Sequence, residues 1–192
     1  MAHPLSRSDP PQSEDNLLSY GHMILPIRIE PAAVLRRKAA TVKVFDQSLK
    51  QLAKDMQTTM HNAIGIGLAA PQVGHGVALI VVEMYDPEND GEQVPFTALV
   101  NPRITWHSLK QVVITEACLS IPGFEGDVRR PEKVRVKAQD TEGRKLTLEA
   151  DGLFARVLQH EIDHLNGILF TDYVPKKKLV ERPLVEYPQT NE

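Results

Sequence analysis

The segment QHEIDH, residues 159–164, carries the strongest chemical signal in the chain. On a helix, His160 and His164 stand four residues apart and share one face, so their imidazoles can bind one metal ion. Glu161 lies beside them, where a carboxylate can take the proton of a metal-bound water. The histidine stripe continues an apolar helix face, which exposed surface histidines would not do. The spacing therefore predicts a metal site with an adjacent general base.

A catalytic metal also needs a third protein ligand and an open position for water. In common zinc peptidases a third histidine follows the helix, but Phe170 stands at that place here. Glu181 and Glu186 have the spacing of a carboxylate ligand, in a tail interrupted by prolines, and Cys118 is the only thiol. The residues alone leave two other interpretations open. One is a metallopeptidase with a ligand in the tail, and the other is a non-catalytic protein with a closed structural metal site.

Three segments in this order and spacing resemble the signature motifs of peptide deformylase, the enzyme that removes the formyl group from the initiating methionine of bacterial and organellar polypeptides. The segments are GIGLAAPQ (65–72), EACLS (116–120) and QHEIDH (159–164), and the resemblance extends from about Ile24 to Tyr173. It implies a metal-dependent hydrolase in which a metal-bound water, assisted by Glu161, attacks the formyl carbon. Strands that precede a helix without β-α-β alternation also favour an α+β fold. We expect antiparallel β-sheets packed around a central helix that carries H-E-x-x-H.

The resemblance assigns a role to each residue that matches a motif. The implied metal ligands are Cys118, His160 and His164, with Glu161 as general acid and base. The implied oxyanion donors are the side-chain amide of Gln72 and the backbone N–H of Leu119, and the implied peptide-binding residues are Gly65, Ile66, Gly67 and Ala117. An apolar pocket would take the methionine side chain, with Ile114, Leu153 and Val157 as its candidate walls.

The resemblance also implies a cofactor and partners. Two histidines and a thiolate suit zinc. The resemblance instead implies a ferrous enzyme that accepts nickel, cobalt or zinc as substitutes, so we expect Fe(II). The expected partners are N-formyl-methionyl peptides and nascent chains at the ribosome. We expect a monomer in a cytoplasm of bacterial type, or in a plastid. A formal net charge of −3 and the lack of an apolar run of about 18 residues argue against nucleic-acid binding and membrane insertion.

Two residues depart from the family pattern. Ala117 replaces the glycine that usually precedes the cysteine. Its added methyl group is harmless if the backbone is extended, and otherwise narrows the peptide groove. Glu125 stands where family members often carry an arginine, so this segment lacks a cation that could bind the peptide. All expected ligands, the general base and the glutamine are present. We therefore expect an active enzyme with an altered substrate preference.

The remaining sequence predicts how these residues are positioned. A length of 192 residues suits one domain, which we place at 24–175, between a disordered N-terminal extension (1–23) and a C-terminal tail (176–192). Apolar periodicity predicts helices over 46–60 and 151–166, strands over 77–84, 96–105 and 111–120, and a hairpin at 133–150. We expect Asp151 to cap the second helix, and residues 65–76 to form an ordered loop or a linker. We also expect an ion pair between Glu116 and Arg130 that braces the cysteine segment against the second helix.

Overall fold

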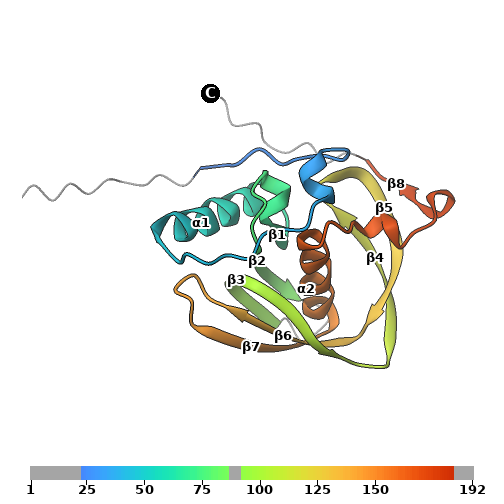
Figure 1. Ribbon diagram of the computed structural model, residues 1–192. Helices are drawn as coiled ribbons and strands as arrows, with labels where there is room; N and C mark the ends of the chain where they lie inside the picture. Colours follow the sequence, from blue (N-terminus) through green and yellow to red (C-terminus); the bar gives the residue numbers. More distant parts are fainter. Residues whose placement is uncertain (1–22, 87–91, 184–192) are drawn as a thin grey trace, which may run out of the picture.

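The computed structural model describes residues 23–86 and 92–183, which form an α+β fold with two antiparallel sheets (Figure 1). The elements, in chain order, are η1 (Ala33–Arg36), α1 (Gln47–Asn62), β1 (Gly67–Ala69), η2 (Ala70–Val73), β2 (Leu79–Asp86), β3 (Glu92–His107), β4 (Gln111–Cys118), β5 (Ile121–Pro131), β6 (Lys133–Gln139), β7 (Lys145–Asp151), α2 (Gly152–Leu165), η3 (Phe170–Asp172), η4 (Lys176–Lys178) and β8 (Val180–Glu181). The expected α+β class and antiparallel sheets are confirmed. The predicted extension falls almost wholly outside the described residues.

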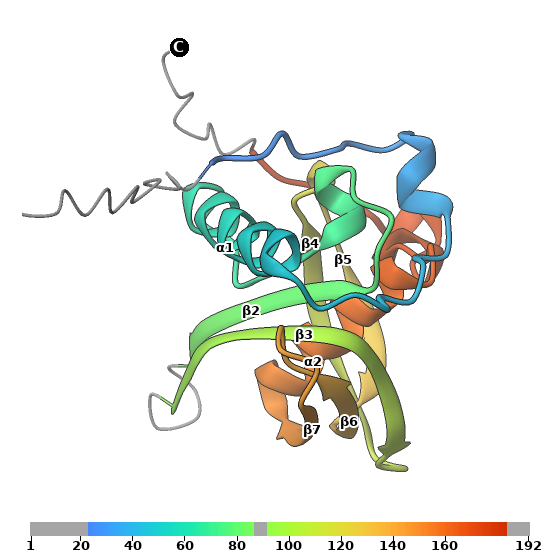
Figure 2. The ribbon, with the colours of Figure 1, turned by 60° about the vertical axis from the view of Figure 1, so that its left-hand side comes forward.

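The larger sheet has the order β1-β2-β3-β6-β7 and is covered by one helix on each face. Side chains alternate along β2, so Leu79 and Val81 pack with α1 whereas Ile80 and Val82 pack with α2. Figure 2 shows β2 passing between the two helices. Burial on both faces explains why β2 is a continuous apolar run in the sequence.

The smaller sheet has the order β4-β5-β8 and lies across α2 from the larger one (Figure 1). Strands β4 and β5 form a tight hairpin, with Gln111 opposite Pro131 and Cys118 opposite Ile121. Strands β1 and β4 are each the terminal strand of their sheet. Each therefore leaves one edge without a strand partner.

Several local predictions are confirmed and two need correction. Helix α1 begins where expected, because the Asp46 side chain accepts a hydrogen bond from the Leu49 N–H. Asp151 occupies the N-cap position of α2 but makes no capping hydrogen bond, since its carboxylate pairs with Lys133 across the β6–β7 hairpin. The segment expected as a loop contains β1 and η2. This strand has three residues and lies in a glycine-rich segment, so it shows no alternation of apolar and polar residues.

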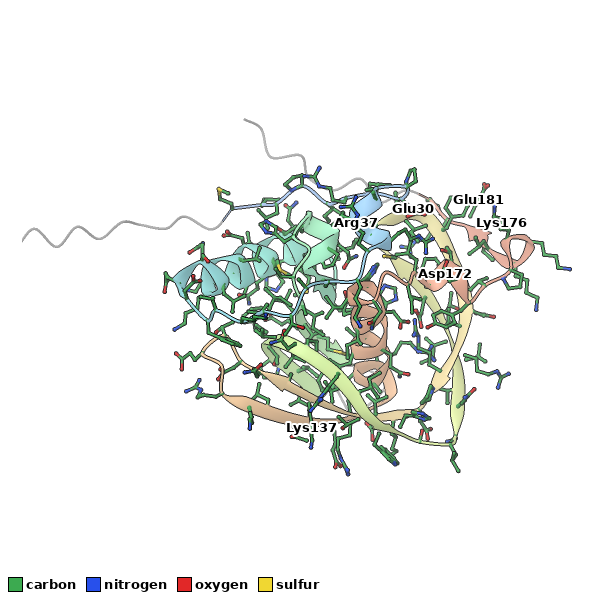
Figure 3. All side chains as sticks on the ribbon, viewed as in Figure 1. Glu30, Arg37, Lys137, Asp172, Lys176 and Glu181 are labelled. Carbon is green, nitrogen blue, oxygen red and sulfur yellow. The ribbon has the colours of Figure 1, made fainter. Side chains whose placement is uncertain are left out.

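The end of α2 is packed against the N-terminal part of the domain. Gly167 has φ 74°, and a Cβ at this position would lie 2.8 Å from the carbonyl carbon of Arg36. Arg36 pairs with Glu30 and Asp172, which lie together at one corner of the molecule (Figure 3). Neither α-helix is long and apolar enough to cross a membrane, among the residues that the structure describes.

Candidate metal centre and active site

Three ligand-bearing side chains converge from two distant segments. Helix α2 contributes His160 and His164, and the last residue of β4 contributes Cys118. One ligand atom from each residue lies within 4.8 Å of the other two, and Cys118 Sγ is 3.2 Å from His164 Nε2. In the described ranges this is the one cluster of three such residues with metal-binding geometry. A thiolate with two imidazoles leaves one position of a tetrahedral metal open.

The hydrogen bonds around the two histidines fit a bound cation. Glu116 holds His160 Nδ1 at 2.9 Å, which leaves Nε2 as the metal-binding atom. Burial lowers the pKa of His164 well below its ordinary value, so this ring is neutral, as a ligand must be. Burial would also lower the pKa of His160, but its bonds to Cys118 and Glu116 raise it well above the ordinary value. The acidic neighbours of His160 therefore favour a positive charge here, which a proton or a metal ion can supply.

The expected competitors for the third ligand position do not reach the cluster. The Phe170 ring stacks on His160 with their centroids 6.4 Å apart, so it packs against a ligand and does not replace one. Glu181 lies exposed on β8, outside the cluster, and Glu186 lies outside the described residues. Among the residues that the structure describes, Cys118 is the candidate for the third ligand that lies beside the two histidines.

Glu116 is the centre of a buried ion-pair network behind the cluster. Its carboxylate accepts hydrogen bonds from Arg130 Nε (2.7 Å), Arg130 Nη2 (3.0 Å), Arg156 Nη1 (2.8 Å) and His160 Nδ1. Arg130 also forms an ion pair with Asp163, which lies one turn after His160 on α2. Burial would raise the pKa of Glu116, but the bonds from His160 and Arg130 hold it well below its ordinary value. The expected Glu116–Arg130 pair is confirmed.

Arg156 is a member of this network that sequence analysis missed. Besides Glu116, its guanidinium binds the backbone carbonyls of Val112 and Val128, on the two strands of the hairpin. The sequence contains one signal that could have identified it, because Arg156 is a charged residue among the apolar residues Phe154, Val157 and Leu158 of the predicted helix. Arg156 ties α2 to both β4 and β5.

Glu161 has the environment of a general base. Burial raises the pKa of its carboxyl to about 7, and its Oε2 atom is buried without a hydrogen-bond partner among the described residues. A Cβ added at Gly67 would lie 2.6 Å from Glu161 Oε1 and 2.8 Å from Val157 Cγ1. The glycine therefore lets β1 approach the helix closely at the carboxylate.

Gln72 is fixed beside the cluster by the turn that η2 makes. Its Oε1 accepts a hydrogen bond from the Ala69 N–H at 2.8 Å, so the amide nitrogen faces the site. Nε2 lies 3.5 Å from Cys118 Sγ and 3.3 Å from Ser120 Oγ. The Ser120 N–H also donates to Cys118 Sγ, at 3.4 Å. These contacts hold the thiol and the amide in fixed relation.

A pocket of about 440 Å³ opens at this site between the edges of the two sheets. The residues predicted to bind peptide all line it, and they are Gly65, Ile66, Gly67 and Ala117. Its lining also includes Gln72, Leu119, Glu161 and the three candidates for the methionine pocket, Ile114, Leu153 and Val157. Of the ligands, Cys118 and His160 line the pocket, whereas His164 is buried behind it. The lining also includes Arg182, which sequence analysis did not single out.

Comparisons with known proteins agree on one family. A family model described as polypeptide deformylase matches residues 24–180. The peptide deformylase of Brucella suis biovar 1 (strain 1330) is 44% identical over 155 residues, which are 81% of this chain and 87% of that protein.

Solved structures give the same result. The peptide deformylase of Synechococcus elongatus, in complex with actinonin, superposes with a TM-score of 0.72 at 44% identity, over 80% of each chain. A class I type b peptide deformylase from Acinetobacter baumannii, with Met-Ala-Ser bound, superposes with a TM-score of 0.75 at 35% identity. That match covers 80% of this chain and 99% of the other.

Proposed function

The chain belongs to the polypeptide deformylase family, and we propose that it removes the N-formyl group from the initiating methionine of nascent polypeptides. Members of this family are metalloenzymes, hydrolases that act on formylated peptides in protein biosynthesis. The observation that carries the proposal is the convergence of Cys118, His160 and His164 beside the buried carboxylate of Glu161, at a pocket between two free strand edges. In this reading α2 is the central helix that carries the catalytic motif.

The chemistry is hydrolysis of a formamide, in which water adds to the formyl carbon and the C–N bond breaks to give formate and a free amine. When bound by Cys118, His160 and His164, the metal supplies the Lewis acidity that polarises the carbonyl and acidifies a water molecule. Glu161 accepts the proton of the attacking water and delivers it to the leaving nitrogen. A pKa of about 7 suits a group that must take up a proton and release it again at neutral pH.

Two donors beside the cluster stabilise the developing oxyanion. The Gln72 amide is held in place through its own carbonyl oxygen, and we assign the second donor to the backbone N–H of Leu119. Donors that are already oriented need no rearrangement as charge develops, and losing one costs about 10²–10³ in rate.

The two free strand edges account for peptide binding. A peptide in extended conformation pairs with the segment of Gly65, Ile66 and Gly67 on one side, and with Ala117 on the other. The methionine side chain enters the apolar region lined by Ile114, Leu153 and Val157. The bound Met-Ala-Ser in the Acinetobacter baumannii relative supports a substrate of this kind.

We propose Fe(II) as the native metal, with zinc, nickel or cobalt as substitutes. The ligand set accepts all four metals, and the assignment of iron rests on the family resemblance. Cys118 lies at the wall of the pocket, where an iron–thiolate pair is open to oxidation. We further propose a monomer that acts on nascent chains at the ribosome, in a cytoplasm of bacterial type or in a plastid, through a catalytic domain at 24–175.

The proposal is tested by deformylation of formyl-Met-Ala-Ser with anaerobically purified protein, and metal content is measured on each preparation. We expect about one metal ion per chain and turnover in the wild type. Cys118→Ala should lose both. Glu161→Gln should keep the metal and lose at least 10²-fold in kcat, the scale of general acid–base catalysis.

Glu149→Gln is the matched control, because Glu149 is an exposed carboxylate on β7 whose one ion-pair partner in the described part of the chain is Arg135. It should leave metal content and turnover at wild-type values. A metal-loaded wild type without turnover, or a Glu161→Gln variant with full turnover, would contradict the proposal. A wild type and a Glu161→Gln variant that both hold the metal and both lack turnover would instead indicate a structural metal site.

A further inference from the structure

The C-terminal segment reaches the mouth of the pocket. Strand β8 pairs with β5, so that Val180 lies opposite Glu125 and Glu181 lies opposite Phe124. The next residue, Arg182, donates its backbone N–H to the Gly123 carbonyl at 3.0 Å. Figure 3 shows Glu181 at the outer edge of the molecule, whereas Arg182 is among the residues that line the pocket.

Arg182 differs from every other charged residue around the pocket. Glu116, Arg156 and Glu161 are buried, and His160 is a candidate ligand, whereas 39% of the Arg182 side-chain surface is exposed. Within residues 23–86 and 92–183, Arg182 is the one exposed charged residue of the lining. A substrate that extends out of the pocket therefore meets a single accessible positive charge.

Glu125 lies beside the Arg182 guanidinium but does not occupy its N–H donors. Arg182 Nη1 lies 3.6 Å from Glu125 Oε2, which is an ion pair but longer than a hydrogen bond. The guanidinium makes no side-chain hydrogen bond to any other residue that the structure describes. Since a guanidinium carries five N–H donors in a planar fork, it can still bind a carboxylate with two of them.

The strand order of the small sheet places β5, which carries Glu125, between β4 and β8. Glu125 lies directly opposite Ala117, the β4 residue assigned to peptide binding. A peptide on the free edge of β4 is therefore separated from Glu125 by β4, and of the two charged residues only Arg182 lines the pocket that the peptide would occupy. The charge is carried by a segment distant in sequence from both the metal ligands and β4.

We propose that Arg182 is a specificity-determining residue that favours substrates with a carboxylate in the two residues after the formyl-methionine. This inference rests on the proposed deformylase function. An acidic side chain and the terminal carboxylate of a short peptide offer the same chemistry, and amidated peptides separate the two sources.

The experiment compares kcat/KM for amidated formyl-Met-Ala-Asp, formyl-Met-Ala-Lys and formyl-Met-Ala-Asn, and for a second set with the variable residue directly after methionine. The wild type should favour Asp over Lys. Arg182→Gln should lower the Asp/Lys ratio about twofold to fivefold, mainly through KM, which is the range of an exposed ion pair. Glu125→Gln should raise the ratio, because it removes the negative charge that competes with the substrate for Arg182.

Three controls make the result specific. Arg135→Gln removes an arginine that pairs with Glu149 on β7, outside the pocket, and should leave the ratio unchanged. Salt at about 0.5 M should bring the wild-type ratio towards one, because it screens exposed charges. Formyl-Met-Ala-Ser with a free carboxylate, compared with its amide, measures the contribution of the terminal charge and should favour the free acid in the wild type but not in Arg182→Gln.

An Asp/Lys ratio that is the same in wild type and Arg182→Gln at both positions would overturn the inference while turnover of the Asn peptide still supports the proposed function. Absence of turnover on all peptides by metal-loaded wild type would contradict the proposed function and this inference together. The neutral peptide thus distinguishes the two failures.

Discussion

Replacing Glu116 with glutamine should be the most destabilising conservative change near the site. The carboxylate is 5% exposed and accepts four hydrogen bonds, two from Arg130 and one each from Arg156 and His160. Glutamine preserves the volume but removes the charge, and its NH₂ group faces donors. Arg130 would keep Asp163, whereas Arg156 would keep only the two backbone carbonyls.

The magnitude follows from the charge left without a partner. Removing one member of a buried ion pair costs about 3–5 kcal/mol. With a urea slope of about 2 kcal/mol per molar, the unfolding midpoint of Glu116→Gln should fall by about 1.5–2.5 M. Because the folded pKa of Glu116 is lowered, the difference from wild type should be complete above its ordinary value of 4.5 and decrease as the pH falls further.

Urea unfolding followed by circular dichroism, on metal-loaded and metal-free protein, measures this difference. Glu149→Gln is the control, since this exposed carboxylate should contribute at most about 1 kcal/mol. Combining Glu116→Gln with Arg156→Met should recover part of the loss, because it removes the uncompensated cation. A Glu116→Gln variant within about 1 kcal/mol of wild type, or no recovery in the double variant, would refute the reasoning.

Two further predictions concern the closeness of β1 to α2 and the coupling of metal to stability. Gly67→Ala should lower both the melting temperature and kcat, because its Cβ would lie within 3 Å of Glu161 and Val157. Gly76→Ala, with no atom within 4 Å of the added Cβ, should change neither. Thermal unfolding and peptide kinetics measure the two effects, and equal behaviour of the two variants would contradict the prediction. Chelation should lower the melting temperature of wild type reversibly, since a ligand that binds only the folded state stabilises it; Cys118→Ala should respond little to the same treatment, and a wild type insensitive to metal removal would contradict the coupling.

The features that could be predicted from sequence depend on neighbours along the chain. His160, Glu161 and His164 share a helical stretch, so their common face follows from helical geometry alone. The Asp46 cap and the β6–β7 hairpin are local in the same sense, and both are present. Cys118 came into the ligand set through the family resemblance, since no spacing rule connects it to α2.

The features that only the tertiary structure decided depend on segments far apart in the chain. The glycine-rich segment becomes a sheet edge because β2 pairs with it, although three residues show no period. Arg156 is buried and connects α2 to the β4–β5 hairpin, because both strands of that hairpin place backbone carbonyls beside its guanidinium. Arg182 lines the pocket because β8 pairs with β5. These contacts join segments that are distant in the sequence, and a local pattern of residue types does not identify the partner segment.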